Sequence, residues 1–192
     1  INMQNTVLII VPTLNSYHIL PKLINSLESQ TSDLWRLILV DGNSSSQHKI
    51  YINSLNKKYS NISLVTQNEK NPGIYGAMNI GINSRRPHEW IMFWGSDDWA
   101  HNKFIIEDIV EIINNKKYKE LDLVFNNAIY IDNFEANKRV SSFRVIKNNL
   151  KLSFFLGFSP AHQACLFSPK ILKRKNSFSL DYFLAADLDY FL

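Results

Sequence analysis

The sequence predicts an α/β fold in which a mostly parallel central sheet carries helices on both faces. Apolar runs with the composition of buried strands alternate with segments whose apolar residues recur at helical spacing. The first run, Val7 to Val11, is apolar throughout, as expected for a strand covered on both faces. Short polar segments follow these runs. This alternation is typical of parallel strands joined by crossover helices.

The predicted elements can be placed in order along the first two thirds of the chain. Pro12 ends the first strand, Asp41-Gly42 ends the second, and Gly95 follows the fourth. The helices between them show apolar residues three or four positions apart. The predicted strands are residues 7–11, 37–40, 62–66, 90–94 and 121–125, and the predicted helices are residues 19–27, 49–58, 77–82 and 103–115.

After Asn126 the pattern becomes less regular. The chain shows no repeat, linker or low-complexity segment, and 192 residues suit one domain, so we expect a single domain over residues 1–192. Residues 182–192 have the composition of the opening of an apolar helix with no stop signal after it. We therefore expect that a C-terminal segment is missing.

Composition indicates an ordinary globular protein. The chain is 45% apolar and 20% charged, with a net charge of +4, and it lacks the concentrated basic stripe that nucleic-acid binding requires. The basic residues gather only at Lys170, Lys173, Arg174 and Lys175. The favoured interpretation of this cluster is a solvated surface, and the alternative is contact with anionic lipid head groups.

The single cysteine, Cys165, excludes an internal disulfide framework and a thiolate zinc cluster. Its apolar neighbours predict a buried, unreactive thiol. Residues 1–6 are polar and do not resemble a signal peptide, and no apolar run is long enough to cross a bilayer. We expect a soluble, cytoplasmic protein.

Polar and acidic groups follow three of the predicted strands. They are Thr13-Leu14-Asn15, Asp41-Gly42-Asn43-Ser44 and Ser96-Asp97-Asp98. Ligands of open parallel sheets bind beyond the carboxyl ends of the strands, so these segments are the candidate site.

Asp97 and Asp98 are the most informative pair. Adjacent carboxylates repel each other, and a hard divalent cation such as Mg²⁺ or Mn²⁺ would relieve that repulsion. The alternative is an aspartate cap for the helix predicted at 103–115. From this segment alone both interpretations stay open.

Other kinds of site are not indicated. The chain has no glycine-rich dinucleotide fingerprint, no P-loop, no nucleophile elbow and no histidine pair at zinc-ligand spacing.

Taken in order, four motifs resemble the inverting glycosyltransferases of family 2, and two later segments resemble the acceptor-side half of that family. The resemblance covers nearly the whole chain. The four motifs are Val11-Pro12-Thr13-Leu14-Asn15, Val40-Asp41-Gly42-Asn43-Ser44, Gly73-Ile74-Tyr75-Gly76-Ala77-Met78-Asn79 and Ser96-Asp97-Asp98, and the later segments are His162-Gln163-Ala164 and Ala185-Ala186-Asp187.

The resemblance implies a GT-A fold. A Rossmann-like, nucleotide-sugar-binding half would cover about residues 1–98, and an acceptor-binding half about residues 99–192. It implies an inverting, metal-dependent transferase that uses Mn²⁺ or Mg²⁺ and a nucleotide-diphosphate sugar, with UDP the commonest nucleotide. The implied acceptor is a saccharide or a lipid-linked saccharide of a surface polysaccharide, met in the cytoplasm or at the inner face of the membrane.

The resemblance also implies roles for single residues on the donor side. Pro12 and Asn15 would line the donor pocket, Asp41 would bind the nucleotide base, Asp97 would contact the ribose, and Asp98 would bind the metal.

Further roles follow for the rest of the chain. Gly73, Tyr75 and Asn79 belong to the segment that would close over the nucleoside. His162 would contact the diphosphate or be a half-buried histidine. Asp187 would be the catalytic base in preference to Asp189, because side chains two positions apart on a helix point in different directions. Without the resemblance, Asp187 would be taken as a solvent-facing or capping carboxylate.

Two alternatives remain. A nucleotidyltransferase would need a glycine-rich, basic loop after the first strand, and Asn15-Ser16-Tyr17-His18 provides neither feature. A non-catalytic module that binds nucleotide sugars would keep the fold without turnover.

Overall fold

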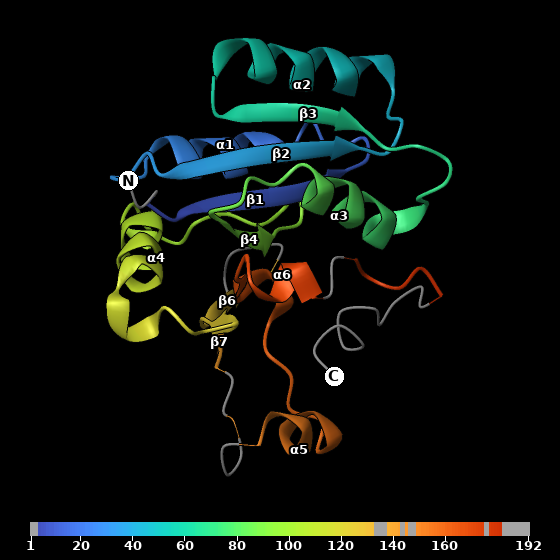
Figure 1. Cartoon of the computed structure of the whole chain (residues 1–192). Helices are drawn as coiled ribbons and strands as arrows, with labels where there is room; N and C mark the ends of the chain where they lie inside the picture. The colour runs from blue at the N-terminus through green and yellow to red at the C-terminus, as the bar shows by residue number, and fades with distance from the viewer. Residues whose placement is uncertain (1–3, 133–137, 143–144, 146–148, 175–176, 182–192) are drawn as a thin grey trace.

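A six-stranded sheet in the order β3-β2-β1-β4-β8-β5 forms the centre of the molecule, and β6 and β7 form a separate two-stranded sheet (Figure 1). The computed structural model describes residues 4–132, 138–142, 145, 149–174 and 177–181. The C-terminal helix predicted from residue 182 onward lies outside this part of the chain.

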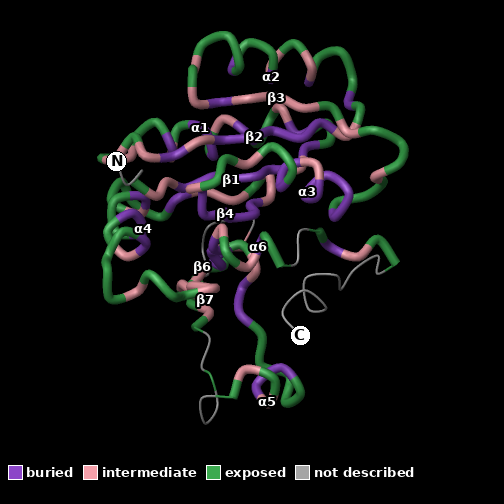
Figure 2. Tube along the Cα trace, in the orientation of Figure 1, coloured by how far each residue is buried: buried purple, intermediate pink, exposed green. Residues whose placement is uncertain are grey.

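The first four strands are parallel and confirm the predicted strand positions to within two residues. They are β1 (Thr6–Thr13), β2 (Trp35–Asp41), β3 (Ile62–Thr66) and β4 (Glu89–Phe93). β1 lies in the middle, and each residue from Val7 to Val11 is 0% exposed, which explains the continuous apolar run (Figure 2). Thr13 lies opposite Asp41, so β1 and β2 end at the same edge.

Helices cover both faces, as predicted. The side chains of β1 alternate, so that Val7, Ile9 and Val11 pack with one group of helices while Leu8 and Ile10 pack with the other. The first group is α1 (Leu20–Glu28), α2 (Ser46–Lys58) and α4 (Ile105–Asn114), and the second is α3 (Gly73–Asn83) and α6 (Ile171–Arg174).

The strand predicted at 121–125 is present and keeps the direction of the first four strands, but it does not lie beside β4. β5 (Leu123–Phe125) is separated from β4 by β8 (Cys165–Phe167), which runs antiparallel to both. Sequence pattern missed β8 because three residues are too few to show a period. The Cys165 thiol is buried in this strand, as predicted, and donates to the Ala161 carbonyl at 3.3 Å.

The chain after α4 consists of short elements. They are η1 (Lys116–Tyr118), β6 (Ala128–Ile131), β7 (Lys138–Ser141), α5 (Leu150–Phe155) and η3 (His162–Ala164). In the described part of the chain, no helix combines the length and the apolar character needed to cross a membrane.

A buried ion pair joins β2 and β4 near the amino ends of the strands. Arg36 donates to both carboxylate oxygens of Glu89 at 2.8 Å, and the Arg86 N–H donates to the same carboxylate at 2.6 Å. Burial alone would raise the pKa of Glu89, but the hydrogen bonds from Arg36 and Arg86 and their charges hold it below its usual value. Glu89 is therefore charged at neutral pH although it is 1% exposed.

We expect the change Arg36→Met to destabilise the protein by about 3–5 kcal/mol, because it leaves the Glu89 carboxylate buried without its partner. Thermal unfolding should show a melting temperature lower by about 10 °C. Lys170→Met is the control, since it removes a cation that pairs with Glu120 at the surface, where ion pairs contribute little. Equal melting temperatures for the two variants would contradict this prediction.

Candidate functional site at the carboxyl edge of the sheet

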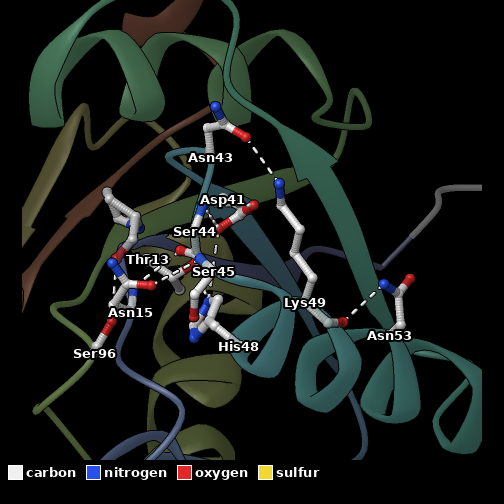
Figure 3. A network of polar contacts seen from close by, with 11 residues as sticks. Thr13, Asn15, Asp41, Asn43, Ser44, Ser45, His48, Lys49, Asn53 and Ser96 are labelled. Atoms are coloured by element: carbon white, nitrogen blue, oxygen red, sulfur yellow. Dashed lines mark hydrogen bonds and ion pairs between the residues drawn. The ribbon is translucent and has the colours of Figure 1, made fainter.

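The loops that follow β1, β2 and β4 are joined at the carboxyl edge of the sheet, as the sequence predicted (Figure 3). The Asn15 backbone N–H donates to Ser44 Oγ at 2.9 Å, and Asn15 Oδ1 accepts from the Ser45 N–H at 2.8 Å. Ser96 Oγ donates to the Pro12 carbonyl at 3.2 Å. Asn15 has a φ of 52°, a left-handed conformation that asparagine tolerates better than most residues. The geometry therefore depends on residue types in all three loops.

Asp41 lies at the centre of this edge. Its two carboxylate oxygens accept from the Ser44 N–H at 3.2 and 3.3 Å, and His48 Nε2 lies 3.7 Å from Oδ1. The same His48 nitrogen lies 3.2 Å from Thr13 Oγ1. Burial lowers the pKa of His48, and this effect is larger than the opposing effect of Asp41. At neutral pH His48 is therefore a neutral group that positions Asp41 and Thr13.

Asp97 and Asp98 follow β4 at the same edge. The Asp98 carboxylate accepts from the Gly95 N–H at 2.6 Å, and burial, with a smaller contribution from Asp97, raises its pKa to about 6. A β-carbon at Gly95 would lie 2.6 Å from Asp97 Oδ1 and 3.2 Å from Asp98 Oδ2. Glycine at position 95 thus leaves room for both carboxylates around one point.

The helix-cap interpretation of this pair is wrong. α4 begins at Ile105 with Phe104 as its cap residue, and no side chain caps it. Asp98 is instead a half-buried carboxylate that interacts with its own loop.

These residues fit a divalent cation that takes most of its ligands from a bound phosphate compound and from water. No group of three or more acidic, histidine or cysteine side chains suited to a metal ion occurs among the described residues. Asp98 offers a hard oxygen ligand, and a nearby cation would favour the ionised form of this carboxyl, which burial disfavours. A cation bound through one or two carboxylates completes its shell with phosphate oxygens and water, as Mg²⁺ commonly does.

The segment Gly73 to Asn79 forms the first two turns of α3, four residues earlier than the predicted start of this helix. Gly73 has a φ of 71°, and its carbonyl accepts from Gln67 Nε2 at 2.7 Å. A β-carbon at Gly76 would lie 2.2 Å from the Asn71 carbonyl oxygen, so the loop before α3 packs against the helix where only glycine fits. This packing outweighs the low helix propensity of glycine.

Asn79 and Tyr75 contact Phe178 rather than open space. Asn79 Nδ2 donates to the Phe178 carbonyl at 3.0 Å and Asn79 Oδ1 accepts from the Phe178 N–H at 2.7 Å. The Tyr75 ring centroid lies 5.5 Å from that of Phe178. Both side chains thus hold the segment after α6 against α3, and their role toward a donor stays a prediction.

His162 lies in η3 beside the end of β4. Its ring is half-buried and lies edge-on to Phe93 and Phe167, with centroids 5.4 and 5.9 Å away. This geometry agrees with the half-buried alternative and leaves a diphosphate contact untested. Asp187, the predicted base, lies outside the described residues.

Sequence pattern placed Thr13 at this edge without a role of its own, and it missed His48 and Gln67. His48 shares the buried side of α2 with Ile52 and Leu55, four and seven positions later, so helical periodicity could have placed it under Asp41. Gln67 directly follows β3, and its N–H donates to the Asp41 carbonyl at 2.8 Å. Its position directly after a predicted strand is the feature of the sequence that could have assigned Gln67 to this edge.

The basic cluster near the end of the chain is partly neutralised. Lys170 lies 3.0 Å from Glu120, and Arg174 lies 3.3 Å from Asp122. This pairing favours the solvated-surface interpretation over a lipid-binding patch.

Comparisons with known proteins identify a family for this chain. The profile described as "Glycosyl transferase family 2" matches residues 8–168. The PGL/p-HBAD biosynthesis glycosyltransferase of Mycobacterium tuberculosis is 26% identical over 188 residues, which are 95% of this chain and 66% of that protein. The UDP-Glc:alpha-D-GlcNAc-diphosphoundecaprenol beta-1,3-glucosyltransferase WfgD of Escherichia coli is 30% identical over 143 residues, 73% of this chain and 54% of that protein. The chain thus spans between 54% and 66% of the length of these relatives.

Solved structures share the fold. The structure of Staphylococcus aureus TarS 1–349 in complex with UDP matches 97% of this chain and 54% of that chain, with a TM-score of 0.71 and 20% identity. The mannosyltransferase PcManGT from Pyrobaculum calidifontis, in complex with GDP-Man and Mn²⁺, matches 94% of this chain and 49% of that chain, with a TM-score of 0.64 and 15% identity. These likenesses confirm the predicted α/β architecture.

Proposed function

This chain belongs to glycosyl transferase family 2 and has the GT-A fold, and from that premise we propose that it transfers a sugar from a nucleotide-diphosphate sugar to an acceptor hydroxyl with inversion. One observation carries the proposal. The loops after β1, β2 and β4 bring Asn15, Asp41 and the Asp97–Asp98 pair to one edge of the sheet. That edge is where open α/β sheets bind nucleotides.

The donor is proposed to lie along this edge with each part against a different loop. Asp41 would accept hydrogen bonds from the base, and its position is fixed by Ser44 and His48. Pro12 and Asn15 would line the nucleotide pocket, Asp97 would contact the ribose, and the start of α3, with Gly73, would close over the nucleoside. UDP is the proposed nucleotide, which the UDP named in the TarS complex and the UDP-Glc named for WfgD support.

Transfer with inversion requires a leaving diphosphate to be stabilised and an acceptor proton to be removed. A divalent cation, Mn²⁺ or Mg²⁺, would be held by Asp98 and the donor phosphates and would neutralise the charge that develops on the leaving group. Above its pKa of about 6, Asp98 is ionised and can serve as that ligand. Asp187 is the proposed base that takes the proton from the acceptor hydroxyl.

The proposed acceptor is a saccharide or a lipid-linked saccharide in surface polysaccharide or glycolipid synthesis. The names of the relatives support this class, because one acts in PGL/p-HBAD biosynthesis and the other on a diphosphoundecaprenol-linked sugar. The proposed location is the cytoplasm, with peripheral contact at the inner face of the membrane.

We expect UDP with Mn²⁺ to raise the melting temperature of the chain more than other nucleoside diphosphates do. A ligand at 100 times its Kd stabilises the folded state by about 2.7 kcal/mol, which corresponds to a rise of about 5–10 °C. A panel of UDP, GDP, CDP and ADP, each with Mn²⁺ or with a chelator, measures this effect.

Matched variants test whether the effect comes from the proposed edge. Asp97→Asn should reduce the shift by UDP, while Asp33→Asn, another exposed aspartate on a distant loop, should leave it unchanged. The absence of a shift with every nucleotide would contradict the proposed function. A normal shift without sugar transfer to any acceptor would instead favour the non-catalytic binding module.

A further inference from the structure

A cavity of about 480 Å³ begins beside Asp98 and is bounded by α4 and by the β6–β7 sheet. Small-molecule pockets in proteins typically measure about 300–1,000 Å³. The donor edge described above leaves this cavity unused, although Asp98 lines it. Its other lining residues come from the end of β4 and the loop after it, from α4, from the segment between β5 and β6, from β6 and β7, and from Gln163 and Ala164.

The cavity extends from the donor edge back along α4. Asn114 at the end of α4 exchanges hydrogen bonds with Asn5 before β1, at 2.8 and 3.0 Å, so α4 ends near the amino edge of the sheet. Ile105, Ile109 and Ile112 of this helix all line the cavity. Ile105 and Ile112 are seven steps apart, which is about 10 Å along a helix. The cavity is therefore long enough to hold a group larger than a single sugar hydroxyl.

The wall opposite α4 is also apolar. Ile129 and Ile131 of β6 and Val140 of β7 line the cavity, while Tyr130 and Arg139, which alternate with them, line a separate cavity. Val140 is 63% exposed, although it lies on the apolar side of its sheet. Apolar side chains gathered in an open cavity mark a site where a ligand covers them.

The charged and polar groups of the cavity indicate which ligand suits it. No lysine or arginine occurs among its described lining residues, and its polar side chains other than the two tryptophans are Asp98, His101, Asp108, Asn126, Asn127 and Gln163. A phosphate group inside the cavity would meet two carboxylates without a permanent cation to balance them. Sugar hydroxyls, in contrast, can donate to Asp98 and to the Gln163 amide.

We propose that this cavity is an acceptor subsite for a sugar that carries a neutral apolar group, alkyl or aryl. The sugar lies at Asp98 and Gln163, next to the donor, and the apolar group lies between α4 and the β6–β7 sheet. This assignment rests on the proposed function, because it takes the Asp98 end of the cavity as the place where transfer occurs. It predicts that acceptors with a neutral aglycone bind better than those with a phosphate next to the sugar.

The test uses octyl β-D-glucopyranoside below its micelle concentration, with glucose and octyl phosphate as comparison probes. Trp94 and Trp99 line the cavity, so their fluorescence reports on its occupation. We expect saturable binding of the octyl glucoside, at least tenfold weaker binding of octyl phosphate, and no response to glucose.

Variants on the two sides of one strand locate the binding. Ile129→Ser should weaken octyl glucoside binding about tenfold, because it removes one apolar side chain from the contact. Tyr130→Ser, on the other side of β6, should leave binding unchanged. Val140→Ser repeats the test at an exposed position where folding is least affected, and melting temperatures verify that each variant is folded.

Several outcomes would overturn the assignment. The first is that octyl glucoside does not bind to a protein that UDP and Mn²⁺ stabilise. The second is that Ile129→Ser and Tyr130→Ser weaken octyl glucoside binding equally, or that octyl phosphate binds more tightly than octyl glucoside. The third is that the wild-type protein is a dimer and that Ile129→Ser dissociates it. Octyl glucoside binding in a protein that no nucleotide stabilises would refute the donor function and leave the cavity as an apolar-ligand site.

Discussion

Replacing Asp98 with asparagine is expected to stabilise the metal-free protein and to lower the rate of sugar transfer about a hundred- to a thousandfold. The two effects have one cause. Burial raises the pKa of Asp98 to about 6, so the fold holds a carboxylate that is partly deprived of water. The ionised form is unfavourable in the free protein and useful only when a cation is present.

The sign of the stability effect depends on pH. The pKa of Asp98 is raised in the folded state, so its contribution to stability is fully present below about pH 3.8 and is lost as the pH rises through about 6. Asparagine does not ionise and can still accept from the Gly95 N–H. At pH 8 the variant should be more stable by about 2 kcal/mol, a rise of about 5 °C in melting temperature, and at pH 4 most of the difference should be gone.

The measurement is thermal unfolding at both pH values, with and without Mn²⁺ and UDP, together with the rate of transfer. Wild type should gain stability from UDP with Mn²⁺, and Asp98→Asn should lose most of that gain. Asp33→Asn, which changes an exposed carboxylate, serves as the control for net charge. A variant that is no more stable at pH 8 than at pH 4, relative to wild type, would show that burial of Asp98 has little energetic cost.

The second large effect is expected for Asp187→Asn, which should lower the rate of transfer about 10²–10⁴-fold and leave donor binding unchanged. Asparagine keeps the size of the side chain but cannot take the proton from the acceptor hydroxyl. The proposed base acts after both substrates are bound, so the stabilisation by UDP with Mn²⁺ should equal that of wild type. This result would distinguish Asp187→Asn from Asp98→Asn, which should lose both the transfer activity and the stabilisation by UDP with Mn²⁺.

Asp189→Asn is the matched control, because it makes the same change two positions away. Transfer is measured with the nucleotide sugar that gives the largest thermal shift and with a panel of glycosides as acceptors. If Asp189→Asn lost activity while Asp187→Asn kept it, the two roles would be exchanged. Equal loss of UDP binding in both variants would indicate that this segment supports the donor instead.

The sequence was sufficient to predict the parallel part of the sheet, because β1 to β4 are long enough to show their pattern. Val7 to Val11 is uninterrupted because both faces of β1 are covered. The pattern failed where pairing is between distant short segments. β8 has three residues, and its place beside β4 depends on a contact between Ile91 and Phe167 that no local period reports.

The candidate site likewise has residues that local pattern can predict and residues that it cannot. Asn15, Asp41 and Asp98 could be predicted because they follow strands, and the ends of parallel strands meet. Spacing to other histidines does not reveal His48, because its partners Asp41 and Thr13 come from two different strands; the signal that could reveal it is its place on the buried side of α2. Asn79 was predicted to belong to the segment that closes over the nucleoside, and this stays a prediction; no local pattern reports the hydrogen bonds of its amide to Phe178, which comes 99 residues later.

The position of β8 between β4 and β5 also sets the order in which the chain can fold. As the chain emerges during synthesis, β2, β3 and β4 can each join strands that are already made. β5 has no partner at that stage, because the edge of β4 beside it belongs to β8, which is made later. Until β8 arrives, β4 presents an open edge, the kind of surface on which chains mispair. The first four strands can therefore pair early, while β5 and β8 join the sheet in a later, long-range step.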